Sequence, residues 1–330
     1  MSSSEIVFTG ADWDRLSQMR ADFLDATDVG GASIDPWHSR RDLELYDATF
    51  GARIGWKWDA VLGEIARRGI VPPQGTLLDW GCGTGVAARA WLRHLGPRWK
   101  VHAHDLSSDA RAFALERVRE EFPSAETAVE VCDAPDVLLV SHVIDELDVG
   151  PLDELVLLAR RARFVVWVEA GAKNTSRALS AQRERLLADL EPLAPCTHGN
   201  ACGILTPEHE RDWCHHFAKP APEAFTTRHW AMFSRTLKID MRSLPYSYLV
   251  MQRRAEAPAR EPGLTRVLGR PGFRKGRALL DACDADGVRT LSLLERTDKL
   301  FFRALENGDV ADTRYRLEVE GTRVKSFTQP

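Results

Sequence analysis

Short apolar runs alternate with amphipathic stretches through the middle of the chain. The apolar runs fall at 76–79, 100–105, 128–131, 137–142 and 164–169. The amphipathic stretches between them fall at 87–95, 108–121 and 152–161. Runs such as VLLVS and FVVWVE are apolar at nearly every position, as parallel strands covered on both faces require. The pattern predicts an α/β fold with a doubly wound, Rossmann-like sheet and a ligand at the carboxyl ends of its strands.

The sequence on either side of this core predicts further elements. Residues 1–75 have the periodicity of two or three helices, which end before Pro72 and Pro73 and would cap the sheet. After the core we expect a helix over 175–190. Strands over 237–241 and 246–252 would then complete the sheet.

Two later segments differ from the core. Residues 191–222 are dense in Cys, His and Pro and have too few apolar side chains for a core of their own, so this insertion needs a metal or an anchor. In the last seventy or so residues, ALLDAC, VRTLSLLER and RYRLEVEG alternate like short strands, with turns at 284–287 and 306–309. We therefore predict an N-terminal helical region (1–75), an α/β domain (76–255), and a basic linker with a small C-terminal β subdomain (256–330).

Composition narrows the class of protein. The 330 residues are 44% hydrophobic and 28% charged, which is typical of a globular protein with one large core and an appendage or with two domains. No apolar stretch approaches the roughly 18 residues that a membrane span requires. The first residues carry acids and lack the apolar segment of a signal peptide. We expect a cytoplasmic monomer that does not enter the membrane.

Charge is unevenly distributed along the chain. The net charge of −4 excludes a protein that binds nucleic acid through overall positive charge. The segment 253–277 is different, because it contains eight basic residues and only two acidic ones, Glu256 and Glu261. The eight are Arg253, Arg254, Arg260, Arg266, Arg270, Arg274, Lys275 and Arg277. This segment predicts either a surface that follows phosphates or a solvated charged linker.

A glycine-rich turn follows the first core strand. In LLDWGCGTGV, residues 77–86, Gly81, Gly83 and Gly85 allow a tight turn close to a ligand, ahead of a helix that offers free N–H groups. Asp105 ends the next strand, where a carboxylate can accept hydrogen bonds from two ribose hydroxyls. Asp79 precedes the first glycine by two positions, so the motif differs from the dinucleotide G-x-G-x-x-G.

This spacing resembles the S-adenosylmethionine loop of class I methyltransferases; a nicotinamide or flavin site and a purely structural turn are the alternatives. The remaining candidate cofactor residues lie in the same loop or at the next strand ends. Cys82 would contact the ligand or pack, Asp133 would contact an adenine, and Ser141 ends the fourth strand.

The catalytic chemistry is less defined. His142, Asp145 and Glu146 follow the fourth strand, where a substrate would approach, although the two acids could equally cap the next helix. Adenine N6 methylation uses an Asn/Asp-Pro-Pro-aromatic turn at this point, and cytosine C5 methylation uses a nucleophilic cysteine. Neither arrangement is present.

Six cysteines in a cytosolic chain are not expected to form disulfides. Cys196, Cys202 and Cys214 lie in the irregular insertion, and Cys283 lies in the distant β segment. Four thiolates suit a zinc ion or an iron–sulfur cluster. At a zinc site, His198, His215 or His216 could replace one thiolate. Free buried cysteines are the alternative.

Several blocks in order, LLDWGCGTG, SHVIDEL, PCTHGNAC, DWCHHF, PYSYLVMQR and ALLDACDADG, resemble the mitochondrial small-ribosomal-subunit methyltransferase-like family and its bacterial relatives. The resemblance covers about residues 36–310. It implies that 76–255 is a class I S-adenosylmethionine-dependent domain and that Cys196, Cys202, Cys214 and Cys283 hold a four-iron, four-sulfur cluster, with zinc as the alternative. Thr197 and Gly203 stand where the family usually has proline.

The resemblance implies binding to the small ribosomal subunit and its RNA during assembly. Two functions therefore remain open. The chain is either an S-adenosylmethionine-dependent rRNA methyltransferase or an RNA-binding assembly factor that keeps the fold without turnover. A small-molecule methyltransferase would have no use for the basic segment and the cysteine-rich insertion.

Overall fold

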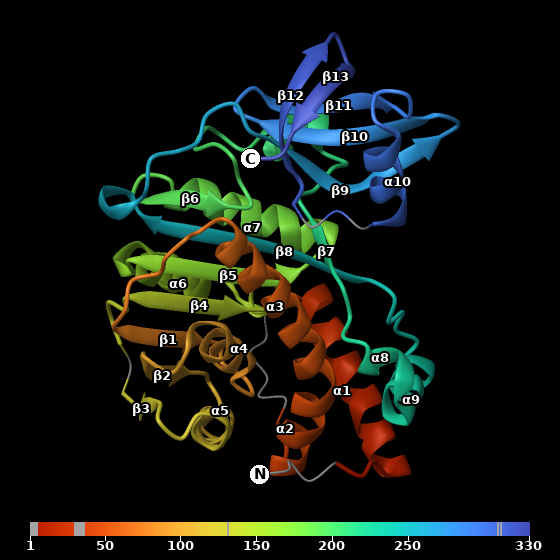
Figure 1. Cartoon of the computed structure of the whole chain (residues 1–330). Coiled ribbons are helices and arrows are strands. Elements are labelled where there is room, and N and C mark those ends of the chain that lie inside the picture. Colours follow the sequence, from red (N-terminus) through yellow and green to blue (C-terminus); the bar gives the residue numbers. More distant parts are fainter. Residues whose placement is uncertain (1–5, 30–36, 131, 309, 311) are drawn as a thin grey trace. The chain divides into compact units, whose positions relative to one another are not determined.

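The computed structural model describes residues 6–29, 37–130, 132–308, 310 and 312–330. Two compact units result. The first takes in the chain up to Glu169 together with Phe217–Leu244, and the second comprises Ala170–His216 and Pro245–Pro330. The labels of Figure 1 are used below for the elements of each unit.

The first unit contains the predicted parallel sheet. Its strands are β1 (Thr76–Trp80), β2 (Lys100–His104), β3 (Glu126–Ala128), β4 (Val137–Ser141) and β5 (Phe164–Ala170). The order β3-β2-β1-β4-β5 reverses direction between β1 and β4, and every pairing within it is parallel. This is the doubly wound, Rossmann-like sheet of class I methyltransferases, which holds its ligand at that switch point. The expectation that the third strand extends to 131 fails at Ala128, and Val131 itself lies outside the described residues.

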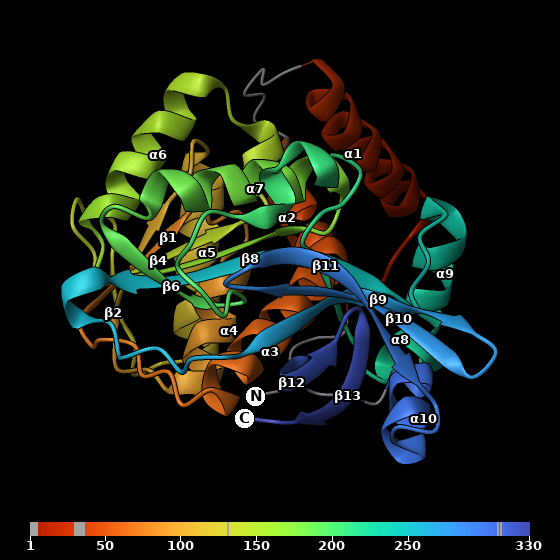
Figure 2. The same ribbon diagram turned by 90° about the horizontal axis from the view of Figure 1, so that it is seen from above.

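Helices connect these strands. They are α4 (Val86–Leu95), α5 (Ser108–Glu121) and α6 (Val149–Arg161), with a short 3-10 helix at Ile144–Glu146. The view in Figure 2 shows α4 and α6 on opposite sides of the strands. Leu77, Leu138 and Val166 are fully buried, as strands covered on both faces require.

Further helices complete the first unit. Those of the N-terminal region are α1 (Gly10–Val29), α2 (Arg40–Tyr46), a π-helical turn (Asp47–Gly51) and α3 (Ala52–Arg67). Two more, α8 (Glu223–Thr226) and α9 (Arg228–Leu237), come from later in the chain. Leu16 and Met19 of α1 pack in one core with Trp230 and Phe233 of α9. The predicted helical cap is thus present.

The predicted strand at 237–241 is wrong, because Leu237 ends α9 and a turn follows. Trp230, Phe233 and Leu237 are buried at a helical spacing of three and four residues. This one-sided apolar face stabilises the helix as far as Leu237, the one residue that it shares with the predicted strand.

The second unit begins with α7 (Lys173–Leu186) and β6 (Leu190–Ala194), and β6 pairs antiparallel with β8 (Leu244–Arg253). Between them lie 3-10 turns at Gly203–Leu205 and Pro207–His209 and the short strand β7 (His216–Ala218). Strand β6 falls in the segment that we expected to be irregular. Pro192 interrupts the sequence pattern typical of a strand, and the register of the β6–β8 pair shifts between Pro192 and Ala194.

The C-terminal part of the second unit is a closed barrel. A 3-10 turn at Arg254–Glu256 leads to its elements β9 (Thr265–Arg274), β10 (Arg277–Asp284), β11 (Gly287–Leu294), α10 (Lys299–Asn307), β12 (Arg314–Glu320) and β13 (Arg323–Thr328). The strands close in the order β10-β11-β13-β12-β9, and β11 runs parallel to β13. Five strands in this order, with a helix between the third and the fourth, form an OB-type barrel. The predicted β subdomain is therefore present, and β9 lies within the basic segment.

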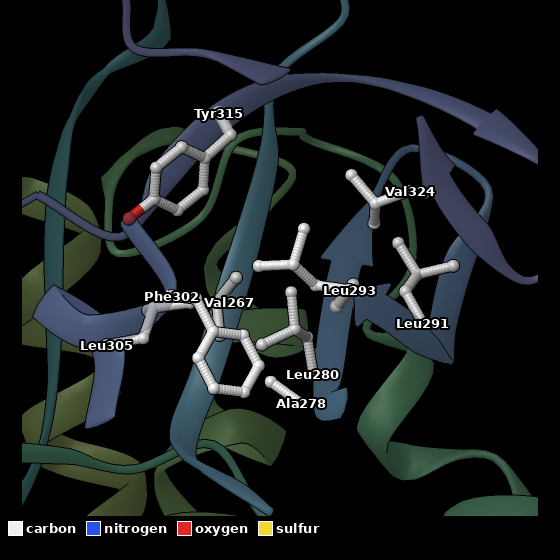
Figure 3. Close-up of a cluster of buried hydrophobic side chains, with 10 residues drawn as sticks. Val267, Ala278, Leu280, Leu291, Leu293, Phe302, Leu305, Tyr315 and Val324 are labelled. Atoms are coloured by element: carbon white, nitrogen blue, oxygen red, sulfur yellow. The ribbon is translucent and has the colours of Figure 1, made fainter. Parts of the chain in front are cut away.

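Alternating inward side chains fill this barrel. Leu280, Leu291 and Leu293 are buried in its centre with Phe302 of α10 and Tyr315 of β12 (Figure 3). The predicted turn at 306–309 is partly the end of α10, which Gly308 terminates with a φ of 71°. Asp309 lies outside the described residues.

The barrel core yields a stability prediction. Leu280 is 3% exposed, and its truncation in Leu280→Ala leaves a cavity that should cost about 2–5 kcal/mol. We expect a clear drop in the midpoint of thermal unfolding. The control Leu300→Ala removes the same atoms from a side chain that is 80% exposed and should change little. Equal midpoints for the two variants would contradict this packing.

Candidate functional site

The turn between β1 and α4 has the backbone geometry that its glycines suggested. Gly81, Gly83 and Gly85 have φ values of 66°, 48° and 76°, all in the left-handed region. A Cβ atom on Gly81 would lie 2.4 Å from Cγ1 of Val143, and one on Gly85 would lie 2.9 Å from Cβ of Ala114. A Cβ atom on Gly83 would meet nothing within 4 Å. Packing thus requires the outer two glycines, while Gly83 borders open space that a ligand could enter.

Asp105 lies against this turn, as its spacing suggested. Its Oδ2 accepts a hydrogen bond from the Gly83 amide at 2.9 Å, and its Oδ1 accepts one from the Ser107 amide at 3.0 Å. The carboxyl end of β2 is therefore joined to the glycine turn after β1. The two features that define the candidate cofactor site meet in the folded chain.

Asp79 is buried beneath the turn. Its Oδ2 accepts a hydrogen bond from the Ala88 amide at 3.0 Å, near the start of α4. Burial raises the pKa of Asp79 to about 7. Its Oδ1 is buried and has no hydrogen-bond partner among the described residues. An unsatisfied buried oxygen is costly, so it marks a position for a water or a ligand donor.

Cys82 belongs to the same turn. Its amide donates to the His104 carbonyl at 3.0 Å, and its side chain is 6% exposed. Burial raises the pKa of the Cys82 thiol well above its usual value, so the group is neutral. Trp80 stacks on His104 with ring centroids 5.3 Å apart, which covers the ends of β1 and β2.

The end of β4 carries a buried pair that the sequence did not reveal. Nζ of Lys57, from α3, lies 2.8 Å from Nε2 of His142. Nε1 of the neighbouring Trp58 donates to Oγ of Ser141 at 2.9 Å. His142 has a φ of 56°, a left-handed conformation that is rare for a side chain with a Cβ atom. Such a conformation is often found at functional sites.

Burial sets the charge of this pair. Burial lowers the pKa of Lys57 to about 7, and the nearby positive charge of Arg53 lowers it further. Burial is also the main reason that the pKa of His142 lies well below its usual value. Lys57 therefore titrates near neutral pH, whereas His142 stays uncharged. A lysine with this pKa can act as a proton acceptor at physiological pH.

Glu169, the last polar residue of the run FVVWVE, was also missed. Its Oε1 accepts hydrogen bonds from the amides of Val143 and Ile144, both at 3.1 Å, and from Nε1 of Trp167 at 2.7 Å. Burial raises the pKa of Glu169 to about 8. The side chain thus orders the loop that follows β4. Its signal in the sequence was its place at the carboxyl end of an apolar strand.

Other predicted residues lie nearby but have less defined surroundings. Asp145 is half-buried and Glu146 is exposed, both in the short 3-10 helix after β4. Asp133 is exposed in the bend before β4. Their assignment as catalytic or adenine-contacting residues remains a prediction.

The four predicted cysteine ligands line one cavity of the second unit. Cys196 follows β6, Cys202 and Cys214 lie in the irregular segment, and Cys283 lies on β10. All four border a cavity of about 30 Å³. This is more than one water requires, and protein interiors contain few larger voids. Chain segments far apart in the sequence therefore converge on the same space.

Polar contacts with α7 hold the irregular segment in place. Nη1 of Arg177 donates to the carbonyls of Ile204, His209 and Asp212 at 2.7, 2.9 and 2.9 Å. Such bonds replace the missing apolar core of this segment. They position Cys202 and Cys214 relative to the helix.

Two buried arginines border the same cavity. Nε of Arg183 donates to Sγ of Cys196 at 3.2 Å and its Nη2 donates to the His198 carbonyl at 3.0 Å. Arg266 donates from Nη1 to the Pro195 carbonyl at 3.2 Å. Side-chain exposure of Arg183 is only 1%. Buried cations are costly unless an anion compensates them, and Glu184 supplies such an anion to Arg183.

The thiols of Cys214 and Cys283 are neutral without a metal. Burial raises the pKa of Cys214 well above its usual value and that of Cys283 to about 12. Nε2 of His198 lies 3.5 Å from Sγ of Cys283, and Nε2 of His216 lies 3.8 Å from Sγ of Cys214. Within the described part of the chain, no three His, Cys, Asp or Glu side chains are grouped closely enough to hold a metal ion. A preformed four-cysteine metal site is therefore not shown.

A family model described as mitochondrial small ribosomal subunit Rsm22 matches residues 77–312, from the first strand of the sheet into the barrel. The chain belongs to the Rsm22 family. The match includes the glycine turn, Asp105 and all four cavity cysteines.

One relative matches a smaller part of this Rsm22 family member. Phosphoethanolamine N-methyltransferase 2 of Caenorhabditis elegans is 37% identical over 102 residues, which make up 30% of this chain and 21% of that enzyme. The match thus spans about a fifth of the relative's length.

Solved structures that are similar include the plantazolicin methyltransferase BpumL with S-adenosylhomocysteine (SAH) bound, with a TM-score of 0.39 at 12% identity, covering 74% of this chain and 97% of that one. TrmK of M. capricolum, solved with SAH, has a TM-score of 0.34 at 8% identity and coverages of 61% and 71%. These low scores support no statement about the substrate.

Among the described helices, none combines the length and the apolar character that crossing a bilayer demands.

The buried Lys57 predicts a dependence of stability on pH. Its folded-state pKa of about 7 lies below the ordinary 10.5, so between these values the unfolded chain binds more protons and stability rises with pH. Between pH 7 and pH 10, the unfolding free energy of the wild type should therefore gain roughly 1–3 kcal/mol relative to that of Lys57→Met. Denaturant titrations at several pH values measure this difference. The exposed Lys299→Met variant serves as the control, and parallel curves for Lys57→Met and the wild type would refute the assignment.

Proposed function

We propose that this chain is an S-adenosylmethionine-dependent methyltransferase that acts on small-subunit ribosomal RNA during assembly. The observation that carries the proposal is the hydrogen bond between Asp105 and the Gly83 amide, which joins the second strand end to a three-glycine turn. The class of RNA comes from the family description, which names the mitochondrial small ribosomal subunit.

The residues fit this cofactor on two independent grounds. Gly83 borders open space in which a nucleoside could approach the backbone, and Asp79 has a buried oxygen with no partner among the described residues. Asp105 would accept hydrogen bonds from the ribose hydroxyls, and Ser141 and Asp133 would lie at the neighbouring strand ends. When bound, the sulfonium supplies an electrophilic methyl group.

The remaining residues would orient the acceptor base and handle its proton. Methyl transfer to a base nitrogen depends mainly on alignment in a partly dry pocket. The amine of Lys57, with a pKa of about 7, is the proton acceptor that we favour over Asp145 and Glu146. Its contact with His142 fixes its position.

One observation favours the second candidate function, an RNA-binding assembly factor without turnover. The polar atoms at the end of β4 already have internal partners, since Ser141 bonds Trp58 and His142 bonds Lys57. A side chain with an internal partner is less available to a substrate. Such a protein would bind the cofactor and RNA but transfer no methyl group.

Asp105→Ala tests the cofactor site. Loss of the ribose acceptor should weaken S-adenosylmethionine binding at least about tenfold, as measured by isothermal titration calorimetry. The control Asp109→Ala removes an exposed carboxylate from the first turn of α5 and should bind normally. Unchanged affinity in Asp105→Ala would exclude this site.

Transfer of a tritiated methyl group to immature small subunits separates the two candidate functions. The methyltransferase should label RNA in the wild type and lose the label in Asp105→Ala. Binding of the cofactor and the subunit without any label would favour the assembly factor.

We further propose that Cys196, Cys202, Cys214 and Cys283 hold an iron–sulfur cluster, with four irons and four sulfides as the form that suits four cysteines. Support comes from the single cavity that they line and from the buried Arg183 and Arg266, which would compensate the negative charge of a thiolate-bound group. A zinc ion would draw its four thiolates to within about 4 Å of one another, since each Zn–S bond is about 2.3 Å. A cluster binds each cysteine through a different iron, so its cysteine sulfurs lie farther apart than those around one zinc ion.

Anaerobically purified protein should be brown and contain iron and sulfide. Cys196→Ser and Cys283→Ser should each lose the visible absorption and lower the thermal midpoint, because ligation free energy contributes to folding. Cys132→Ser, at a cysteine away from the cavity, should keep both. Stoichiometric zinc without iron would overturn the cluster and leave the four-cysteine site in place.

A further inference from the structure

The basic segment 253–277 divides into two parts in the folded chain. Arg254 and Arg260 both pair with Glu191, with Arg254 at 2.5 Å. Arg266 is buried beside the cysteine cavity. These arginines therefore have structural partners within the second unit and are not available to an external anion.

Arg253 ends β8. The other four cations gather on the β9–β10 hairpin, which both views show extending from the barrel as a two-stranded ribbon (Figures 1 and 2). Arg270, Arg274, Lys275 and Arg277 are all exposed there. Among the residues that the structure describes, Arg274, Lys275 and Arg277 have no side-chain hydrogen bond or ion pair. The hairpin therefore presents cations to solvent.

The geometry of the hairpin sets its three arginines on one face. Arg274 and Arg277 lie directly opposite each other in the antiparallel register. Residues 270, 272 and 274 alternate with Phe273, whose ring packs on Phe302 of α10 with centroids 5.6 Å apart. Like charges in directly opposed positions destabilise a strand pair. An external anion would relieve this repulsion.

Acids on the neighbouring strands do not provide that anion. Asp281 accepts a hydrogen bond from Thr290 at 2.9 Å, and Asp284 pairs with Arg289 at 2.6 Å. On the β12–β13 hairpin, by contrast, Arg316 pairs with Glu261 and Lys325 pairs with Glu320 at 2.5 Å. In an OB-type barrel, the loop between the first two strands is one of the loops that contact oligonucleotides. Lys275 lies in that loop, and Arg274 and Arg277 flank it.

We propose that the β9–β10 hairpin binds single-stranded RNA through its phosphates. This inference rests on the proposed function, which makes the substrate an RNA, and it names the surface that holds it. The barrel's aromatic rings, including Phe273, Phe302 and Tyr315, belong to its core, so base stacking on an exposed ring is not expected. Binding is therefore electrostatic, strongly dependent on salt and largely independent of sequence.

The test compares Arg274→Ala/Arg277→Ala with a double variant of equal charge. Arg228 and Arg235 on α9 are exposed and have no ion pair or side-chain hydrogen bond within the described chain, so Arg228→Ala/Arg235→Ala is the control. The full-length proteins are titrated with a fluorescent single-stranded RNA of about 20 nucleotides and mixed sequence at several salt concentrations. The hairpin variant should bind roughly tenfold more weakly and lose about 1.4 from its log–log salt slope, about 0.7 for each phosphate contact.

Three results would overturn the inference. Equal losses in the two double variants would mean that general charge, rather than the hairpin, holds the RNA, while the proposed function would stand. Tighter binding of a duplex of the same length, with the same loss in the hairpin variant, would replace the single-strand assignment by a duplex one. Failure of the wild type to bind any RNA would refute both this inference and the RNA substrate of the proposed function. Calorimetry with S-adenosylmethionine shows in each case that the first unit is intact.

Discussion

The first unit depends on one steric constraint, the close packing of the turn between β1 and α4. Gly81 lies against Val143 of the loop after β4, and Gly85 lies against Ala114 of α5, at distances that leave no room for a Cβ atom. The turn is thereby held between neighbouring elements, and the Gly83 amide is directed toward Asp105. Open space at Gly83 is a consequence of how its two neighbours pack. The candidate cofactor site at this strand end thus depends on the packing of the sheet itself.

The second unit is stabilised in a different way, because its irregular segment lacks an apolar core. Arg177 supplies three hydrogen bonds that hold this segment to α7. Arg183 and Arg266 bring positive charge into the interior near the neutral thiol of Cys214, and Glu184 pairs with Arg183. Thiolates held by a metal would add to this compensation, since thiolates and guanidinium groups would then offset each other. Folding of this segment and occupation of the cavity are therefore linked on our proposal.

Sequence reasoning succeeded where a pattern is local. Near-continuous apolar runs predicted the parallel sheet, and the spacing of the glycines and Asp105 predicted their meeting. It failed where distant residues decide the outcome. Lys57 and His142 lie 85 positions apart and meet only in the fold, and Glu191 neutralises two arginines that looked like part of a phosphate surface. The strand predicted over 237–241 shares only Leu237 with α9, and a turn occupies the residues that follow.

Strand β10 connects the two sites proposed for the second unit. It begins at Arg277, in the cationic hairpin, and carries Cys283 near its other end, paired with Arg266 and Val288. A register shift between Leu279 and Asp281 separates the two ends, and the Phe273–Phe302 contact positions the hairpin end. Ligation at Cys283 would restrain the far end of the same strand. Because the register of a strand determines which face each side chain occupies, restraint at Cys283 would also preserve the alignment of Arg274 with Arg277. Cluster binding and RNA contact would then share one element, although no residue takes part in both.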